Sequence, residues 1–187
     1  MQRFFDDFVS LDRFTLSLDS LGESLQCPHC LKSNHLISHG IVYKQFAIHK
    51  REAVGKRVFC SNRHQRSGCG RTVQLYLKKV FPSLQYGASQ LFVFLSLLLL
   101  KTSVKVAYQT ATDQNDSRQA WRWLNKLNLK LTDFRCALEL SGKTSDCEFT
   151  HKGRRLRLLL STLKNLFSKL TDCPCSNYQL IYQQAFI

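Results

Sequence analysis

Four cysteines in two pairs are the residues whose type and spacing point most directly to chemistry. Cys27 and Cys30 are separated by two residues, and Cys60 and Cys69 are separated by eight. A Cys-x-x-Cys turn brings two thiolates to one side of the backbone, and four thiolates are a common ligand set of structural zinc. The pairs therefore predict a zinc ribbon whose metal ligands are Cys27, Cys30, Cys60 and Cys69, with an expanded second knuckle.

Two other interpretations of these cysteines stay open. Free cysteines are often small buried side chains, and paired cysteines can form disulfides. The first residues of the chain lack the apolar core of a signal peptide, so we expect a cytoplasmic protein in which clustered cysteines favour metal. His29 and His64 lie inside the two knuckles. Either histidine is an alternative ligand to a cysteine.

Positive charge is concentrated around the predicted metal site. The chain has a net charge of +14, residues 1–26 are net −3, and residues 27–80 carry eleven Lys or Arg against one acid, Glu52. Such a field attracts a polyanion, because each neutralised phosphate releases a counterion. A solvated basic surface is the alternative, but the excess exceeds what solubility needs. The basic residues of the ribbon expected at nucleic acid are Lys50, Arg51, Lys56, Arg57, Arg63, Arg66 and Arg71.

The elements that must position the cysteines are short strands. Alternating apolar residues predict strands over 36–44, 45–49 and 54–59, with an exit strand over 73–77. We expect a three-stranded antiparallel sheet pinned by zinc in this segment, and such a sheet is too small to fold without its metal. Residues 1–26 are expected to form a short helix followed by an extended arm.

After the ribbon the sequence turns helical. The apolar run 91–100 is half of the roughly 20 residues that a bilayer requires, so we expect a buried helix and no membrane segment. This helix is expected to start near Ser89 and to continue over 101–109. A polar loop over 110–117 then places Asp116 or Ser117 as an N-cap.

The following helix is amphipathic and resembles a DNA-reading element in its pattern. Over 118–127 its apolar face consists of Ala120, Trp123, Leu124 and Leu127. The residues expected at or near DNA are Arg118, Gln119, Trp121, Arg122 and Lys126. A short helix, a turn and a helix with a basic outer face predict a helix-turn-helix that enters the major groove. An ordinary amphipathic helix with a solvated basic face is the alternative.

Residues 136–187 are less informative. An amphipathic helix over 154–170 carries a broad apolar stripe, which suits either core packing or a homodimer interface. Cys173 and Cys175 could form a second metal pair, for which only Cys136 and Cys147 are possible partners. Their spacing is too tight for a ribbon knuckle.

Two runs of residues resemble a known family. Phe59–Arg63 followed by Gly68–Thr72 resembles the zinc ribbon at the N-terminus of insertion-sequence transposases and related mobile-element proteins, and Ala120–Leu124 resembles the recognition helix that follows it. The resemblance covers roughly residues 25–130. It implies that the four cysteines bind metal and that the outer face of the helix contacts DNA. The long second knuckle departs from the commonest pattern of this family.

The catalytic part of such transposases is missing. Acidic-triad transposases bind two metal ions through three carboxylates on a large sheet. Only about fifty residues follow the predicted helix-turn-helix, and their acids, Glu139, Asp146, Glu148 and Asp172, have no alternating strand and helix pattern to hold them. A small nuclease is the third hypothesis, but no paired acid and base groups support it. We therefore do not expect an enzyme.

The sequence thus predicts an α+β protein, with a zinc-ribbon antiparallel sheet followed by a mostly α-helical domain containing a helix-turn-helix. The expected segments are an N-terminal helix and arm (1–26), the ribbon (27–80), the helical domain (81–135) and a C-terminal packing or dimerisation helix (136–187). The expected function is a DNA-binding protein of a bacterial mobile element, associated with the nucleoid, acting in transposition or transcription regulation. Its partners would be double-stranded DNA and a separate transposase. The alternative is a zinc-ribbon adaptor of a larger nucleic-acid-processing complex.

Overall fold

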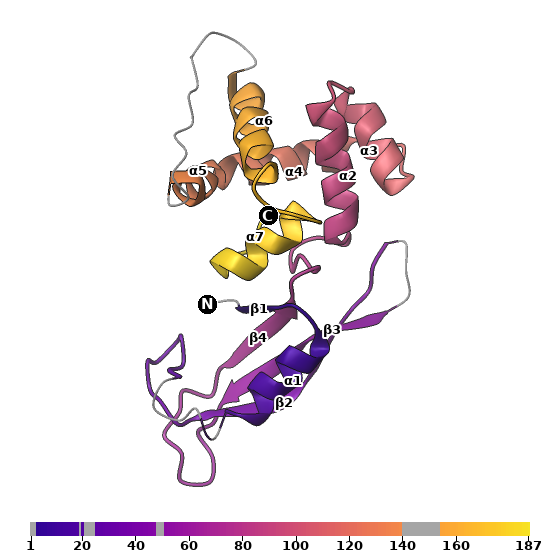
Figure 1. The fold of residues 1–187 in the computed structure, drawn as a ribbon. Coiled ribbons are helices and arrows are strands. Elements are labelled where there is room, and N and C mark those ends of the chain that lie inside the picture. The colour runs from indigo at the N-terminus through magenta and orange to yellow at the C-terminus, as the bar shows by residue number, and fades with distance from the viewer. Residues whose placement is uncertain (1–2, 19, 21–24, 48–50, 140–153) are drawn as a thin grey trace. The chain divides into compact units, whose positions relative to one another are not determined.

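The α+β class predicted from the sequence is confirmed by a computed structural model of the chain, which describes residues 3–18, 20, 25–47, 51–139 and 154–187. The described residues form one four-stranded sheet and seven helices (Figure 1). The chain divides into two compact units, residues 1–85 and 86–187. The sheet belongs to the first unit, and the second unit is helical.

The sheet of the first unit is mixed. Its strands are β1 (Arg3–Phe5), β2 (Leu36–Lys44), β3 (Glu52–Cys60) and β4 (Thr72–Leu77). The order is β1-β4-β3-β2, so the three predicted ribbon strands form an antiparallel meander and β1 adds a fourth, parallel strand beside β4. The pairing of β1 differs from the short helix and extended arm that were expected over residues 1–26, because the segment begins with a strand of the sheet.

The helix of the N-terminal segment follows β1. Helix α1 (Phe8–Leu16) begins after a capping box, in which the Asp7 carboxylate accepts from the Ser10 amide at 2.7 Å and the Asp7 amide donates to the Ser10 hydroxyl at 3.3 Å. A reciprocal cap of this kind fixes a helix start. The residues before it are therefore free to extend along β4, and the order is strand then helix, the reverse of the prediction.

Helix α1 lies against one face of the sheet. Leu11 is fully buried on the helix, and Val58 and Leu75 are buried on the strands. A cation joins the two layers, since the Lys56 ammonium of β3 lies 2.8 Å from the Asp12 carboxylate and donates to the Thr15 hydroxyl at 3.0 Å. The N-terminal segment is therefore a structural part of the first unit.

The predicted strand over 45–49 is wrong where the structure describes it. Residues 46 and 47 lie outside the strands, and 48–49 lie outside the described residues. Phe46 is buried, and the Ala47 amide donates to the Gln85 carbonyl at 3.0 Å. This segment is therefore bonded to the end of the first unit instead of to a neighbouring strand.

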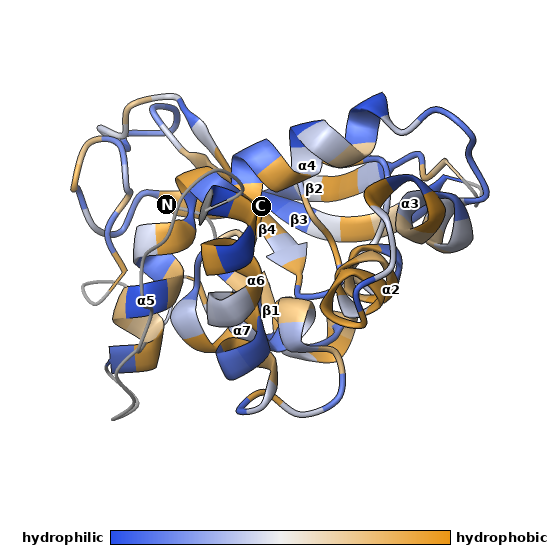
Figure 2. Ribbon diagram, turned by 90° about the horizontal axis from the view of Figure 1, so that it is seen from above, coloured by the Kyte–Doolittle hydropathy of each residue, from blue (hydrophilic) through white to orange (hydrophobic). Residues whose placement is uncertain are grey.

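Six helices make up the described part of the second unit. They are α2 (Ala88–Leu99), α3 (Val104–Thr112), α4 (Arg118–Leu129), α5 (Leu131–Glu139), α6 (Arg154–Phe167) and α7 (Pro174–Tyr182). Figure 2 shows α2 almost wholly in the hydrophobic colour, whereas α4 and α5 alternate between the two colours. This contrast agrees with a central helix and amphipathic neighbours.

The expected continuation of the α2 helix over 101–109 is also wrong. The chain turns at Lys101, whose φ of 64° lies in the left-handed region and ends the helix. Helix α3 then starts afresh after Ser103, whose hydroxyl accepts from the Val106 amide at 3.4 Å. A Ser cap satisfies an amide that the first helical turn leaves unbonded, so the sequence contains two helices where one was expected.

The C-terminal segment packs within the second unit. Helix α6 contacts α2, α4 and α5, and its residues Leu159, Leu163 and Leu166 are buried there. This favours core packing over a dimer interface for the apolar stripe. The chain therefore has one division, after Gln85, in place of the expected boundaries after residues 26, 80 and 135.

Candidate metal centre and basic surfaces

Four cysteine sulfurs meet at one end of the sheet. Cys27 and Cys30 come from the turn before β2, Cys60 ends β3, and Cys69 lies in the loop before β4. All four Sγ atoms lie within 4.8 Å of one another, with 3.7 Å between Cys27 and Cys69 and 3.7 Å between Cys30 and Cys60. The predicted ligand set is thus brought together, and it could hold a metal ion.

The first knuckle is a tight turn whose amides point at sulfur. The Leu31 amide donates to the Cys27 carbonyl at 2.8 Å, and the His29 amide donates to Cys27 Sγ at 3.4 Å. The amide of Lys32 faces Cys30 and, as the largest cause, lowers the pKa of the Cys30 thiol to about 7. Amide donors favour the thiolate, which is the form that binds metal.

The second knuckle closes its eight-residue loop with backbone bonds. The Gly68 amide donates to the Ser61 carbonyl and the Gly70 amide to the Cys60 carbonyl, both at 2.9 Å. The Cys69 amide donates to Cys60 Sγ at 3.3 Å, the same bond that the first knuckle makes. The expanded loop therefore returns Cys69 to Cys60 as a two-residue knuckle would.

Two glycines make this return possible. A Cβ on Gly68 would lie 2.7 Å from Cys60 Sγ and 2.3 Å from the Ser61 carbonyl oxygen, so no side chain fits there. Gly70 has a φ of 71°, in the left-handed region that glycine adopts without steric cost. Burial raises the pKa of the Cys60 thiol to about 12. A cation among the sulfurs would displace that proton.

The histidines of the knuckles do not join the cluster. His29 and His64 are exposed, and the metal-type cluster found among the described residues consists of the four cysteines alone. Cys136, Cys173 and Cys175 take part in no such cluster within the described ranges, and Cys147 lies outside them. The second metal site considered from the sequence gains no support.

The predicted cations of the ribbon fall into two groups. Arg57, Arg63 and Arg71 are exposed. The remaining cations have other placements. Lys56 is paired with Asp12 beneath α1, and Arg66 is half-buried. Arg51 stacks on Tyr43, with its guanidinium carbon 4.8 Å from the ring centroid. Lys50 lies outside the described residues. Lys56 is thus engaged within the first unit, by Asp12 and by the Thr15 hydroxyl of α1.

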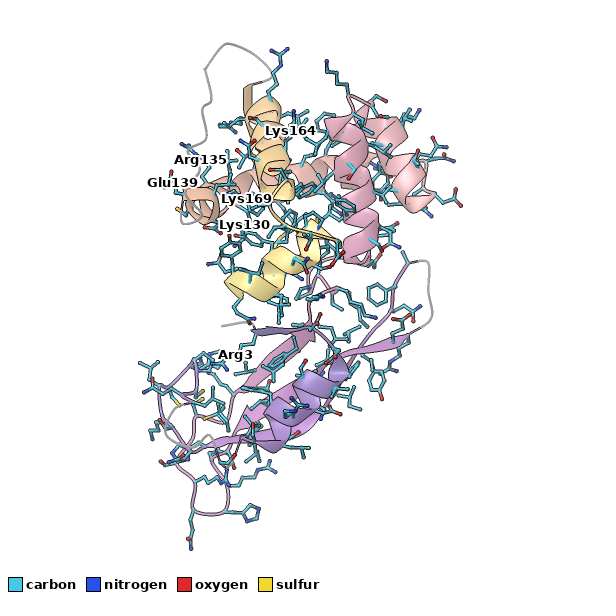
Figure 3. The ribbon with its side chains drawn as sticks, in the orientation of Figure 1. Arg3, Lys130, Arg135, Glu139, Lys164 and Lys169 are labelled. Atoms are coloured by element: carbon cyan, nitrogen blue, oxygen red, sulfur yellow. The ribbon has the colours of Figure 1, made fainter. Side chains whose placement is uncertain are left out.

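A further cation of this unit serves the layer contact. Arg3, labelled in Figure 3, extends from β1 with its guanidinium carbon 5.3 Å from the centroid of the Phe14 ring on α1. Contacts of this kind between a cation and an aromatic face stabilise by about 0.5–1 kcal/mol at exposed sites. Arg3 therefore adds to the attachment of α1, together with Lys56.

Helices α3 and α4 are joined by residues 113–117. Asp113 ends α3 with a φ of 56°, and Asp116 caps α4, since its carboxylate accepts from the Arg118 amide at 3.0 Å. The same carboxylate pairs with the Arg118 guanidinium at 2.6 Å. These donors hold the pKa of Asp116 at about 2. Of the two caps considered from the sequence, the side chain of Asp116 makes the bond and that of Ser117 does not.

The outer face of α4 presents the predicted residues unequally. Trp121 and Arg122 are exposed, and Arg118 is exposed but paired with Asp116. Gln119 and Lys126 are half-buried. Further cations are found elsewhere in the same unit, including Lys130, Arg135, Lys164 and Lys169 (Figure 3). The ion pair of Arg118 was missed from the sequence, although an Asp two residues before an Arg at a helix start is a readable signal.

No family model, no curated protein and no solved structure matches this chain. None of the described helices combines the length and the apolar character that crossing a membrane requires.

Proposed function

We propose that this chain is a DNA-binding protein that combines a zinc ribbon with a helix-turn-helix. The observation that carries the proposal is the cluster of four cysteine sulfurs within a segment of net charge +10. A structural metal would hold this segment in one conformation and present its cations as a fixed array. An array of this kind neutralises phosphates with little ordering cost at the moment of binding.

The sulfur geometry fits zinc. Zn–S bonds of about 2.3 Å in a tetrahedron require sulfurs about 3.8 Å apart. The sulfurs of Cys27 and Cys69 lie 3.7 Å apart, and so do those of Cys30 and Cys60. The ligands would be Cys27, Cys30, Cys60 and Cys69. When bound, zinc supplies a cross-link between the two knuckles. The exposed cations Arg57, Arg63 and Arg71 would then contact phosphates.

Helix α4 would read the bases. The connection 113–117 separates it from α3, as in a helix-turn-helix whose second helix enters the major groove. Trp121 and Arg122 are among its exposed large side chains, and an Arg can bond two acceptors on a guanine edge. Arg118 would exchange Asp116 for a phosphate, since an exposed ion pair costs little to separate.

The resemblance of the ribbon and of α4 to mobile-element proteins gives this proposal its biological setting. The chain would recognise the ends of an element or its own operator, either as a transposition accessory beside a separate transposase or as a regulator of transcription.

The test is a selection of binding sites from a pool of random duplexes, followed by footprinting with the zinc-loaded protein. We expect one preferred site, and Arg122→Ala should weaken binding to it roughly five- to a hundredfold and relax the preference at particular bases. Arg155→Ala is the matched control, because Arg155 is an exposed cation of α6. It should leave the preference unchanged.

Other results would point elsewhere. Binding without a preferred site, weakened equally by Arg122→Ala and Arg155→Ala, would favour the zinc-ribbon adaptor of a larger complex. Failure to bind any duplex would overturn the proposal.

A further inference from the structure

A pocket opens on the face of the ribbon sheet away from α1. Its volume is about 250 Å³, and it is lined by Ile37, His39, Phe59, Ser61, Arg63, His64 and Thr72. Ile37, Phe59 and Thr72 are directly opposite one another on β2, β3 and β4. Side chains alternate between the two faces of a strand. The preceding residue of β3, Val58, is buried on the α1 side, so Phe59 and its neighbours belong to the other face.

A bulge in β2 aims His39 at this pocket. Ser38 is opposite Val58 and Gly40 is opposite Arg57, so His39 is an extra residue without a partner in the ladder. Gly40 has a φ of 125° and supplies the conformation that the bulge needs. The His39 ring lies 5.3 Å from the Phe59 ring between centroids, at 35°. Phe59 is half-buried, and part of its ring lines the pocket.

The rim of the pocket is cationic and polar. Arg63 is exposed, and its guanidinium has no ion-pair or hydrogen-bond partner among the described residues. His64 stands beside it with a φ of 50°, and Thr72 adds a hydroxyl. Among the residues that the structure describes, no Asp or Glu lines the pocket. An aromatic floor with a cationic rim therefore faces solvent in the most basic segment of the chain.

We propose that this pocket binds one unpaired nucleotide, with its base stacked on Phe59 and His39 and its phosphate at Arg63. Single-stranded nucleic acid is recognised by this combination of an aromatic platform and a positive groove. The volume of about 250 Å³ can take a base, while the sugar and the phosphate would lie at the rim beside Arg63. Bases inside a duplex are already stacked on their neighbours and cannot reach the platform.

This function goes beyond the reading of duplex DNA by α4. It would let the protein hold a flipped, frayed or single-stranded nucleotide while the helical unit binds a neighbouring duplex. The aromatic platform and helix α4 use different residues in different units, and only Arg63 is proposed for both activities. Phe59→Leu and Arg122→Ala should therefore remove the two activities separately.

The probe is a labelled oligothymidine of about eight nucleotides with one central 2-aminopurine, whose fluorescence falls when the base is stacked. An oligouridine of the same length is the second probe, and a blunt duplex is the third. With zinc-loaded full-length protein, we expect the single strand to bind and the 2-aminopurine to be quenched. Phe59→Leu should weaken binding roughly five- to a hundredfold and abolish quenching. Equal affinity for the two single strands would show recognition of base and phosphate, whereas tighter binding of the uridine probe would assign the site to RNA.

Matched variants separate the pocket from general effects. Arg63→Gln should weaken single-strand binding and reduce the dependence on salt by about one ion. Phe14→Leu and Arg13→Gln alter an aromatic and a cation of α1, on the other face of the sheet, and should change neither. His39→Ala removes an exposed ring and tests the platform without loss of a buried side chain.

The proposal is overturned if both Phe59→Leu and His39→Ala, with zinc still bound, keep the affinity and the quenching of the parent protein. It is equally overturned if the single strand does not bind. Loss of duplex binding in Arg122→Ala with the single strand still bound is expected. Single-strand binding by a parent protein that binds no duplex would overturn the proposed duplex reading alone.

Discussion

Trp121 and Trp123 are two positions apart in α4, yet Trp121 is 52% exposed and Trp123 is completely buried. The ring of Trp123 is surrounded by those of Tyr86, Phe94 and Tyr108, at centroid distances of 5.3, 5.5 and 5.3 Å and in edge-to-face orientations. Such pairs stabilise beyond the area that they bury. One helix thus carries the largest buried side chain of the core and an exposed ring on its outer face.

We expect the two tryptophans to respond differently to truncation. Trp123→Ala should lower the free energy of unfolding by about 3–5 kcal/mol, because it leaves a cavity at the centre of the helical unit. Trp121→Ala should change it by less than about 0.5 kcal/mol and should weaken duplex binding. Urea unfolding followed by near-ultraviolet circular dichroism measures the first effect. A larger stability loss for Trp121→Ala would contradict the assignment of the two faces.

Metal content tests the cysteine cluster directly. We expect one zinc ion per chain by native mass spectrometry, and Cys27→Ser and Cys69→Ser should each lose it together with the folded state of the first unit. The control is Cys173→Ser, since Cys173 lies in the helical unit and outside the cluster. If the parent protein contains no metal after purification in the presence of zinc, the proposed zinc ribbon is contradicted.

Gly68 tests the geometry of the second knuckle without removing a ligand. Gly68→Ala would place a methyl carbon 2.7 Å from Cys60 Sγ and 2.3 Å from the Ser61 carbonyl oxygen, so the loop must shift. We expect zinc affinity, measured by competition with a chelator, to fall by tenfold or more, as for other changes that disturb ligand orientation. Ser67→Ala, at the exposed neighbouring position, should retain the parent affinity. Equal affinities for the two variants would show that the loop is free to move.

The cap of α4 predicts a dependence on pH. Bonds from Arg118 hold the pKa of Asp116 at about 2, below its usual value of 3.8. A carboxyl whose pKa is lowered on folding contributes stability above its unfolded pKa, and this contribution disappears as the pH falls through the folded value. The melting temperature of the parent should therefore exceed that of Asp116→Asn near pH 5. The difference should shrink between about pH 4 and about pH 2. A constant difference across this range would show that the carboxylate does not cap the helix.

The features that could be predicted from the sequence are those that depend on residues near one another in the chain. The spacing of the cysteines identified the four sulfurs that meet, and the period of Ala120, Trp123 and Leu127 identified the buried face of α4. The buried face of α4 is defined by residues within one helix, and the sulfur cluster is defined by two cysteine pairs, each of which is close in sequence. The metal identity and the contacts with DNA stay predictions.

Competition between local and distant contacts explains the errors. The apolar spacing of Phe4, Phe8 and Leu11 suits a helix. The capping box at Asp7 starts the helix only at Phe8, however, and Phe4 lies in β1, which pairs with β4. In the same way, Lys56 is an ordinary surface cation in the sequence, and only the placement of α1 brings Asp12 to it. Neither outcome can be read from a window of neighbouring residues.

The parallel pairing of β1 with β4 has a consequence for folding speed. Arg3 is opposite Leu75, 72 positions later in the chain, so the sheet closes only after a long loop has been brought together. Contacts of this separation raise the contact order and slow folding. The two knuckles lie inside that loop, and a metal ion joining them would shorten the path that remains. Metal binding to the two knuckles should therefore come before the pairing of β1 with β4 during folding, so that the ion speeds closure of the sheet as well as cross-linking the knuckles.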